Sequence, residues 1–481
     1  MSLKQHYILA LDCGSTNFKA AVFDQNLRRL GEYSMPLHYT VHGSGRMEFD
    51  ARAAWRTTER FIRRVCVQGG LKPADITTIA LTSQANTFCA LNAAGQSMMP
   101  FMSWQDQRAS QEAAWLNRRL GEGFHHHCSW PRLIPGNQAA MMLWLRRHKP
   151  AMIKNASAFV TVPGFLVSRL GFPNAVDTNL AAMSGLYSLK CNCWWPASLD
   201  FCGVAEKSLP VVVPLGRKLK AVKHWPNSIL PNLAEAVLAG NDQTAGAFGN
   251  FCSRKNIVIT LGTALVVYRI MGRQRGPYTA NGCWGPYPGG GYYELATRNH
   301  GCIALDWARA RLAPGRNIQF FTTLARKALV RRQEMADHQA EALFYPDAMN
   351  TKCAWVGNPE PGARILSVFE GIGFTLKQLI EDDLGVCVPM PEIRVTGGGS
   401  ANAFWLQLLA DILDARVAQC AGDALYGAAR IACLRASAPR ENEKAVWFEP
   451  RDAKMQSARY DRWKKQRSFA VRRPIQRSKT W

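Results

Sequence analysis

The chain carries one short pattern twice, near its start and near its middle. Residues 7–24 read YILALDCGSTNFKAAVFD, and residues 256–270 read NIVITLGTALVVYRI. Each segment is an apolar run, a tight turn with glycine and a hydroxyl residue, and a second apolar run, which predicts a β-hairpin. A repeat about halfway along a chain of 481 residues indicates two related domains.

Strand and helix patterns alternate along the rest of the chain. Residues 76–82 predict a strand, and residues 139–147 predict a helix. Residues 362–382 and 401–413 carry apolar side chains at helical spacing, with a short strand and a glycine turn between them. This alternation predicts an α/β architecture. We expect domains at residues 1–245 and 246–445, followed by a basic tail at residues 446–481.

The formal net charge of +24 invites a nucleic-acid-binding interpretation. From Lys454 to the end, however, ten residues are Lys or Arg and only Asp461 is acidic. We therefore expect part of the excess charge to lie outside the fold, in a solvated tail whose residues after about Ser468 are disordered and dispensable for catalysis. Nucleic-acid binding stays the lesser alternative, because no recognised motif accompanies the charge.

Composition argues for a cytoplasmic protein. No run of 18 apolar residues predicts a membrane span, and the N-terminus lacks the apolar core of a signal peptide. The 14 cysteines contain no Cys-x-x-Cys pair, which favours free thiols over structural zinc. We expect His125, His126 and His127 to lie in a solvated loop rather than at a metal.

The first hairpin contains Asp12-x-Gly14-Ser15-Thr16-x-x-Lys19. Glycine at the bend lets phosphate oxygens approach the backbone, the hydroxyls can donate hydrogen bonds, and Lys19 can balance charge. Asp12 can hold Mg²⁺ directly or through water. An ordinary Asp-x-Gly turn is the alternative, and the chain has no Gly-x-x-x-x-Gly-Lys-Ser/Thr loop.

Three later elements suit the same chemistry. Asp242 precedes a run of small residues at a helix start, where it can serve as a base for an attacking hydroxyl or simply cap the helix. Gly262 and Thr263, in the second hairpin, can bind phosphates from the other domain. The run Gly397 to Asn402 is a strand–glycine–helix junction that permits close approach of a ring or phosphate.

In this order the four elements resemble the FGGY carbohydrate kinase family, which includes glycerol kinases and xylulokinases. The resemblance covers roughly residues 7–445 and includes Ser83-Gln84 and the run from Trp104 to Arg108, which looks like the family's Trp-x-Asp-x-Arg motif. It implies two actin-like/ribonuclease H-like domains that close over ATP and sugar in an interdomain cleft. It also implies ATP and Mg²⁺ as cofactors and a small sugar or polyol as substrate.

The same resemblance implies a role for each matching residue. Asp242 is the catalytic base, and Asp12 is the catalytic carboxylate that holds the metal. The residues implied to bind ATP are Gly14, Ser15, Thr16, Lys19, Gly262, Thr263, Gly397, Gly398 and Asn402. The residues implied to bind substrate are Gln84, Asn86, Trp104, Asp106, Arg108 and Gln243.

The sugar side departs from the family. Ala85 and Asn86 replace the Arg-Glu of glycerol kinases and the Met-His of xylulokinases, while Met141 and Gly164 replace a common Lys and Asp. Neither glycerol nor xylulose therefore follows as the substrate. Trp104 stacks on the sugar or packs in the core, and Arg108 binds the sugar or anchors Asp106. A non-catalytic sugar- or nucleotide-sensing protein on the same fold is the alternative function, and the oligomeric state stays open, with a homodimer among the alternatives.

Overall fold

The computed structural model describes residues 6–43, 45–222, 228–335, 342–351, 354–357, 360–387, 389–433 and 445–471. The chain forms two compact units, each assembled from several segments. Unit 1 consists of Met1–Phe251, Ile270–Glu294 and Gly422–Asn442, and unit 2 consists of Cys252–Arg269, Leu295–Ala421 and Glu443–Trp481.

Unit 1 is built on a six-stranded sheet with the strand order β14-β15-β6-β1-β2-β3. Its strands are β1 (Tyr7–Cys13), β2 (Asn17–Phe23), β3 (Arg29–Pro36), β6 (Ile76–Ser83), β14 (Lys218–Lys220) and β15 (Glu235–Asn241). The first hairpin forms as expected, with β1 antiparallel to β2, whereas β1, β6 and β15 are parallel. Three strands therefore end at the same edge of the sheet.

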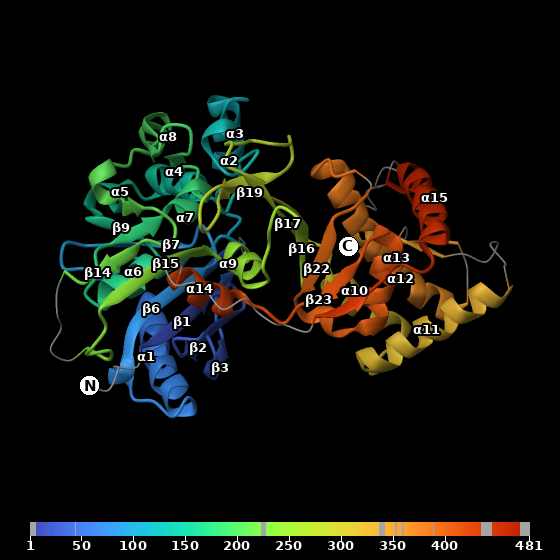
Figure 1. The fold of residues 1–481 in the computed structure, drawn as a ribbon. Coiled ribbons are helices and arrows are strands. Elements are labelled where there is room, and N and C mark those ends of the chain that lie inside the picture. Colours follow the sequence, from blue (N-terminus) through green and yellow to red (C-terminus); the bar gives the residue numbers. More distant parts are fainter. Residues whose placement is uncertain are drawn as a thin grey trace. The chain divides into compact units, whose positions relative to one another are not determined.

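The two faces of this sheet are covered by different helices. Leu9 and Leu11 pack in one cluster with α1 (Ala51–Gln68) and α6 (Val162–Arg169). Ile8 and Ala10 pack in another cluster with α9 (Asp242–Gly249) and α14 (Ala424–Ala432), which returns from the far end of the chain (Figure 1). Because side chains alternate along a strand, Asp12 shares the face of Ile8 and Ala10. Its side chain is directed to the α9 and α14 side.

The rest of unit 1 carries a second, five-stranded sheet with the order β4-β5-β8-β7-β9. Its strands are β4 (Thr40–His42), β5 (Arg46–Phe49), β7 (Phe88–Leu91), β8 (Phe101–Met102) and β9 (Ala158–Thr161). The further helices are α2 (Ser110–Leu120), α3 (Phe124–His127), α4 (Gln138–His148), α5 (Pro150–Asn155), α7 (Thr178–Met183) and α8 (Pro196–Cys202). Short strands complete it: β10 (Ala175–Asp177), β11 (Tyr187–Ser188), β12 (Cys193–Trp194), β13 (Val211–Val213) and β18 (Cys283–Pro286).

The histidine run is not the solvated loop that we expected. It lies in α3, where His125 is only 8% exposed and donates from Nε2 to the Gly282 carbonyl oxygen at 2.9 Å. His127 stacks on Trp195 with ring centroids 4.3 Å apart. His125 is therefore buried and His127 partly buried, whereas His126 is exposed, and the described residues contain no group of three side chains suited to a metal.

Unit 2 repeats the plan of unit 1 around β16 (Asn256–Leu261) and β17 (Leu265–Gly272). The sheet order β19-β17-β16-β22-β23 matches β3-β2-β1-β6-β15 of unit 1 position by position. Its other strands are β19 (Tyr292–Arg298), β20 (Leu343–Phe344), β21 (Trp355–Val356), β22 (Glu392–Thr396), β23 (Val417–Gln419) and β24 (Val446–Phe448). In both units the antiparallel hairpin adjoins a parallel strand, which confirms the expected pair of actin-like α/β domains.

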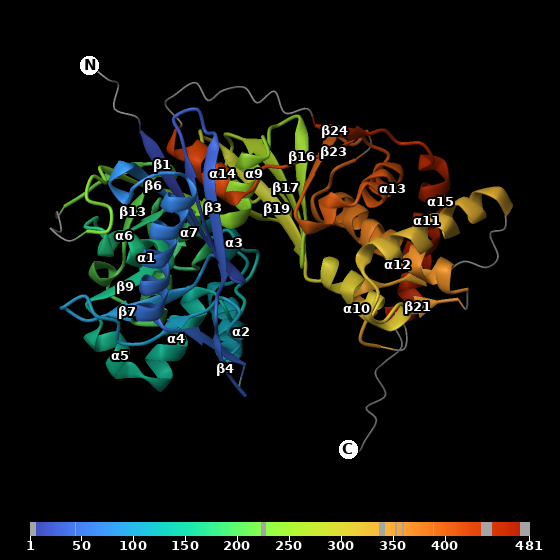
Figure 2. The same cartoon turned by 90° about the horizontal axis from the view of Figure 1, so that it is seen from below.

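Helix α12 (Pro361–Gln378) is the centre of the unit 2 core. It packs against α10 (Cys302–Leu312), α11 (Ile318–Met335) and α13 (Ala403–Leu413), as Figure 2 shows, and continues into a π-helical turn, Leu379–Asp383. Thirteen of its residues are buried. Two of them, Gly371 and Gly373, lie so close to Phe344 and Ile412 that an added Cβ would collide with these neighbours. The helix is therefore buried on nearly all sides, as expected of a central helix.

The basic C-terminal segment is part of this core and does not lie outside the fold. Strand β24 pairs with β23, and α15 (Ala453–Val471) buries Tyr460 and Trp463 against α12. The indole N–H of Trp463 donates to the Phe344 carbonyl oxygen at 2.9 Å. The expectation of a solvated tail from residue 446 is wrong as far as Val471, and the segment after it lies outside the described residues.

No helix in the described part of the chain is both long enough and apolar enough to span a bilayer.

Candidate active site

The carboxyl ends of the three parallel strands of unit 1 bring the predicted residues together. Asp12 lies opposite Thr82 in the β1–β6 register, and Asn241 lies opposite Ser83 in the β6–β15 register. Asp12 is therefore the last residue but one of β1, Gln84 directly follows β6, and Asp242 directly follows β15. In open α/β sheets, ligands usually bind at the edge where the carboxyl ends of the parallel strands lie.

Asp12 is a buried carboxylate with an unsatisfied oxygen. The residue is 7% exposed, and Oδ1 has no hydrogen-bond partner among the described residues. Burial first, and then the charges of Asp242 and Asp423, raise its pKa to about 8, against the opposing effect of Lys19. An orphaned carboxylate oxygen fits a divalent cation, and Mg²⁺ in particular binds through one or two carboxylates plus water and phosphate oxygens.

This environment makes Asp12 a liability for stability, which gives a testable prediction. Because its folded-state pKa lies above the unfolded value of 3.8, stability falls as pH rises from about 4 to about 8. Asp12→Asn removes this loss, so its melting temperature should exceed that of the wild type increasingly over this range, by about 2–4 °C for each kcal/mol. Differential scanning fluorimetry from pH 4 to 9 measures it, and an advantage that is constant or absent across the range contradicts the prediction.

Asp242 is the first residue of α9, and the helix cap is its neighbour. Asn241 Oδ1 accepts from the Thr244 N–H at 2.8 Å, so the N-cap reading of Asp242 does not hold. The Asp242 carboxylate accepts from the Gln243 N–H at 2.9 Å. Burial raises its pKa to about 6, although the Gln243 hydrogen bonds and Lys19 oppose the shift. A carboxylate with this pKa is ionised at neutral pH and more basic than an exposed one.

Helices α9 and α14 approach each other unusually closely beside these carboxylates. A Cβ added at Gly427 would lie 1.8 Å from the Ala245 carbonyl oxygen, and one at Gly249 would lie 2.4 Å from the Asp423 carbonyl oxygen. Only glycine allows this contact. The positive dipole ends of both helices favour anions at this side of the sheet.

Sequence reasoning missed Asp423, which caps α14. Its Oδ1 accepts from the Tyr426 N–H at 2.8 Å and pairs with Arg29 Nη2 at 2.8 Å. Its charge contributes to the raised pKa of Asp12. The signal was available as an aspartate directly before an apolar helical run, which is a capping pattern.

The turn between β1 and β2 holds the predicted phosphate-binding residues. Thr16 is exposed, Ser15 and Lys19 are half-buried, and Lys19 lies opposite Asp12 in the hairpin register. A Cβ at Gly14 would lie 2.9 Å from the Asn17 carbonyl oxygen, so the turn is as tight as the sequence suggested. The ammonium group of Lys19 therefore belongs to the strand position directly beside the buried carboxylate of Asp12.

Gln84 connects this turn to the neighbouring loop. Its Nε2 donates to the Gly14 carbonyl oxygen at 3.3 Å, and its Oε1 accepts from Thr87 Oγ1 at 3.1 Å and from Tyr39 at 3.4 Å. Thr87 Oγ1 in turn accepts from the Trp104 N–H at 3.2 Å. One amide therefore fixes the phosphate turn relative to the loop that carries Trp104.

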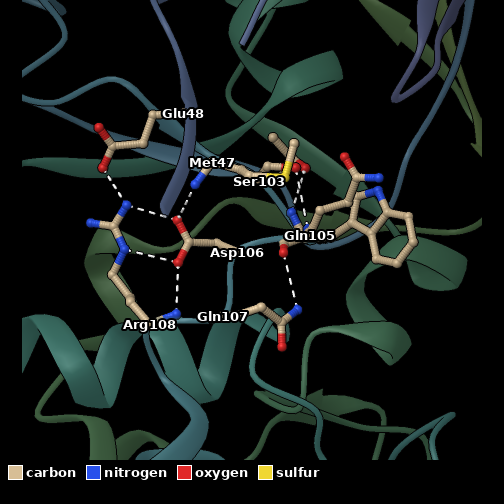
Figure 3. Close-up of polar contacts among 9 residues, drawn as sticks. Met47, Glu48, Ser103, Gln105, Asp106, Gln107 and Arg108 are labelled. Carbon is tan, nitrogen blue, oxygen red and sulfur yellow. Dashed lines mark hydrogen bonds and ion pairs between the residues drawn. The ribbon is translucent and has the colours of Figure 1, made fainter. Parts of the chain in front are cut away.

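Asp106 and Arg108 form a buried pair (Figure 3). The Asp106 carboxylate, fully buried, accepts from the Met47 N–H at 2.9 Å, from the Arg108 N–H at 3.0 Å, and from Arg108 Nε at 2.9 Å and Nη2 at 2.7 Å. Arg108 also pairs with Glu48 and lies over the Trp144 ring at 5.1 Å. Of the two interpretations of Arg108, the contacts match an anchor for Asp106, because Nε and Nη2 of Arg108 both donate to its carboxylate.

Asn86 and Trp104 lie in loops with constrained backbones. Asn86 has φ of 66°, is 5% exposed, and accepts at Oδ1 from the Gln138 N–H at 3.3 Å. Trp104 is half-buried, and a Cβ at Gly136 would lie 1.6 Å from its carbonyl oxygen. Met141 is fully buried in the core of α4, and Gly164 is buried in α6, so neither departure from the family pattern adds a polar group here.

The predicted residues of unit 2 gather at the corresponding edge of its sheet. Gly262 and Thr263 follow β16, and Gly397 and Gly398 follow the parallel neighbour β22, whose Thr396 lies opposite Thr260. The Asn402 side chain is occupied, since Oδ1 accepts from the Trp405 N–H at 3.3 Å and Nδ2 donates to Thr322 Oγ1 at 2.9 Å. The Asn402 amide therefore holds the start of α13 in place, while the glycine turns lie at the ends of β16 and β22.

Comparisons with known proteins place this geometry in context. The model for the N-terminal domain of the FGGY family of carbohydrate kinases matches residues 7–249, and the model for the C-terminal domain matches residues 257–436. Xylulose kinase of Escherichia coli is 25% identical over 415 residues, which cover 81% of this chain and 82% of that protein.

Two solved structures share the fold. The ligand-bound xylulose kinase from Lactobacillus acidophilus is 19% identical, with a TM-score of 0.86 over 97% of this chain and 99% of that one. The Plasmodium falciparum glycerol kinase with ADP is 15% identical, with a TM-score of 0.83 over 98% of this chain and 99% of that one.

Proposed function

The chain belongs to the FGGY family of carbohydrate kinases, and we propose that it transfers the γ-phosphoryl group of ATP to a hydroxyl of a small sugar or polyol with Asp242 as the base. The observation that carries the proposal is the meeting of Asp12, Lys19 and Asp242 at one edge of the unit 1 sheet. A buried carboxylate with a free oxygen, an ammonium group and a second carboxylate of raised pKa are the groups that phosphoryl transfer requires.

In the proposed reaction, Asp242 accepts the proton of the substrate hydroxyl as its oxygen attacks the γ-phosphorus. The new P–O bond forms while the bond to the β-phosphate oxygen breaks, and ADP leaves. Asp12 holds Mg²⁺, which when bound neutralises phosphate charge. Lys19 and the backbone and hydroxyls of Gly14, Ser15 and Thr16 contact phosphate oxygens.

Support for ATP as donor comes from the family and from the Plasmodium relative, whose structure holds ADP. Xylulose and glycerol are the substrates named for the relatives, but Ala85 has no polar side-chain atom and Asn86 offers one amide. We therefore propose the class, a small sugar or polyol, with Gln84, Asn86, Trp104 and Gln243 on the substrate side. Asp106 and Arg108 bind each other and so hold in place the loop that carries Trp104.

The deciding experiment is an ADP-release assay with ketoses, aldoses and polyols, each at several concentrations and with Mg²⁺. One or a few of these should stimulate ADP release well above the sugar-free rate, and product analysis should show the phosphorylated sugar. If sugars change the melting temperature but none stimulates ADP release, the non-catalytic sensor replaces the kinase proposal.

Gly136→Ala should weaken the substrate side selectively. The added Cβ would lie 1.6 Å from the Trp104 carbonyl oxygen, so the Trp104 backbone must move. We expect a loss of roughly 1–3 kcal/mol in stability from overpacking and a higher KM for sugar with the KM for ATP unchanged. Steady-state kinetics measures both constants.

Gly123→Ala is the matched control, because a Cβ there meets no atom within 4 Å and the glycine has a negative φ of −67°. Equal rises of KM for sugar and ATP in Gly136→Ala would contradict the role of Trp104.

A further inference from the structure

The Asp242 carboxylate accepts hydrogen bonds from its neighbour Gln243, which belongs to the same junction and cannot by itself fix the position of that junction. Asp242 lies at the junction of β15 and α9, where Gly240 has φ of 75° and the β6–β15 register is interrupted between Leu238 and Asn241. Backbone in this conformation does not follow from the strand or from the helix. Some other part of unit 1 must determine where the Asp242 carboxylate points.

That part is Asn179, in α7. Its side chain is fully buried and makes four hydrogen bonds. Oδ1 accepts from the Asn241 N–H at 3.0 Å and from Asn241 Nδ2 at 2.8 Å. Nδ2 donates to Thr244 Oγ1 and to the Pro286 carbonyl oxygen, both at 3.0 Å. These bonds use the full capacity of one amide, two donors and two acceptors, which no other side chain of this size provides.

Three of the four bonds hold the residues on either side of Asp242. Asn241 precedes it, and Thr244 follows it within the first turn of α9. The Asn241 side chain, whose amide nitrogen bonds Asn179, also accepts from the Thr244 N–H at 2.8 Å. Asn241 and Thr244, which lie before and after Asp242, are therefore hydrogen-bonded to each other and to the side-chain amide of Asn179.

Two further contacts hold Gly240. Asp177 Oδ2 accepts from the Gly240 N–H at 3.3 Å, and Thr82 Oγ1 donates to the Gly240 carbonyl oxygen at 2.9 Å. Asp177 Oδ1 accepts from the Asn179 N–H at 2.9 Å and so places Asn179 itself. A Cβ at Gly240 would lie 3.1 Å from Asn179 Cγ, so the two segments are in close contact.

We infer that Asn179 is a positioning residue for the reaction, which holds the β15–α9 junction so that Asp242 faces the substrate hydroxyl. The inference rests on the proposed role of Asp242. Asn179 touches neither nucleotide nor sugar in this assignment, so its loss should lower kcat and leave the KM values for sugar and ATP within about twofold. A displacement of the base by about 1 Å lowers turnover by up to 10²-fold, so Asn179→Ala should lose between about 10-fold and 10²-fold in kcat.

The test is a double-mutant cycle with Asp242→Asn, measured as kcat and both KM values. If Asn179 acts through Asp242, adding Asn179→Ala to Asp242→Asn should lower kcat by less than about twofold, because the base is already absent. A merely structural role would lower kcat by the same factor in both backgrounds, and that result overturns the inference. An unchanged kcat for Asn179→Ala also overturns it.

Asn117→Ala is the matched control. It removes two hydrogen bonds to Leu133, at 2.9 and 2.8 Å, from another part of unit 1, and it should leave kcat unchanged. Melting temperatures and circular dichroism of each variant show whether it folds, and Asn179→Asp, which keeps the acceptor oxygens and loses the donors, replaces Asn179→Ala if the latter does not. Normal turnover of Asp242→Asn would overturn the base assignment and this inference together, whereas slow Asp242→Asn with normal Asn179→Ala overturns only the latter.

Discussion

Asp242→Asn should lower kcat by at least roughly 10²-fold, the contribution of a general base. The amide keeps the size and the hydrogen bond from the Gln243 N–H but cannot accept the substrate proton. The KM values should change little, because the base acts mainly in the transition state. Steady-state ADP release with the sugar identified in the panel measures the effect.

The pH profile gives an independent readout of the same group. Burial raises the pKa of Asp242 to about 6, and a base must be deprotonated to act, so kcat/KM should fall as pH decreases through about 6. The residual activity of Asp242→Asn should lack this acid limb. Asp50→Asn is the control, because Asp50 only caps α1 and asparagine caps equally well. If the fall in kcat/KM at acid pH persists in Asp242→Asn, a group other than Asp242 causes that fall.

Arg459→Met should destabilise unit 2 by roughly 3 kcal/mol at most, below the roughly 3–5 kcal/mol for a buried charge left with no partner, because Arg332 still pairs with Glu370. Glu370, 1% exposed in α12, pairs with Arg459 Nη2 of α15 at 2.6 Å and with Arg332 Nη2 of α11 at 2.7 Å. Burial alone would raise the pKa of Glu370, but the two guanidinium groups outweigh it and lower the pKa to about 2. Urea denaturation monitored by tryptophan fluorescence measures the loss.

Controls separate this buried pair from the basic charge around it. Lys464, on α15 like Arg459, is half-exposed, and its Nζ lies 3.6 Å from Asp382 Oδ1. Lys464→Met should therefore change the free energy of unfolding by no more than about 1 kcal/mol. Because the folded pKa of Glu370 is below its ordinary value of 4.5, its contribution is complete above about pH 4.5 and is lost as pH falls towards 2. Equal effects of the two substitutions would contradict the role of Glu370.

Truncation addresses the end of the chain directly. Deletion of residues 453–481 removes Tyr460 and Trp463 from the core and should prevent stable folding of unit 2. Deletion of residues 472–481 alone should leave kcat unchanged, as the sequence suggested for the end of the basic segment.

The sequence predicted the elements whose pattern is local. Both hairpins and the alternating strands and helices follow from apolar spacing and from motifs of a few residues. The convergence of Asp12 and Asp242, which lie far apart in the sequence, was expected only from the resemblance to the kinase family. Lys19 is opposite Asp12 because a two-strand hairpin fixes the register.

The missed features depend on contacts distant in sequence. The basic composition of α15 conceals Trp463, whose partners Phe344 and Tyr345 lie more than 100 residues earlier. The four bonds of Asn179 join segments near residues 179, 241 and 286, and no periodicity connects them. The prediction of a solvated loop for the histidine run was wrong for the same reason, since the Gly282 carbonyl oxygen that binds His125 is 157 residues away in the sequence.

The return of α14 to unit 1 has a consequence for biosynthesis. Its Leu425, Ala428 and Ile431 complete the apolar cluster that includes Ile8 and Ala10, yet they are made after almost all of unit 2. At ordinary translation rates, roughly 10–35 s separate Phe251 from Ala432. Throughout that interval the nascent chain exposes one apolar sheet face, the face that also carries Asp12. The helix that covers this face is therefore made long after the strands beneath it, and a first half cut after residue 251 lacks part of the apolar cluster around Ile8 and Ala10.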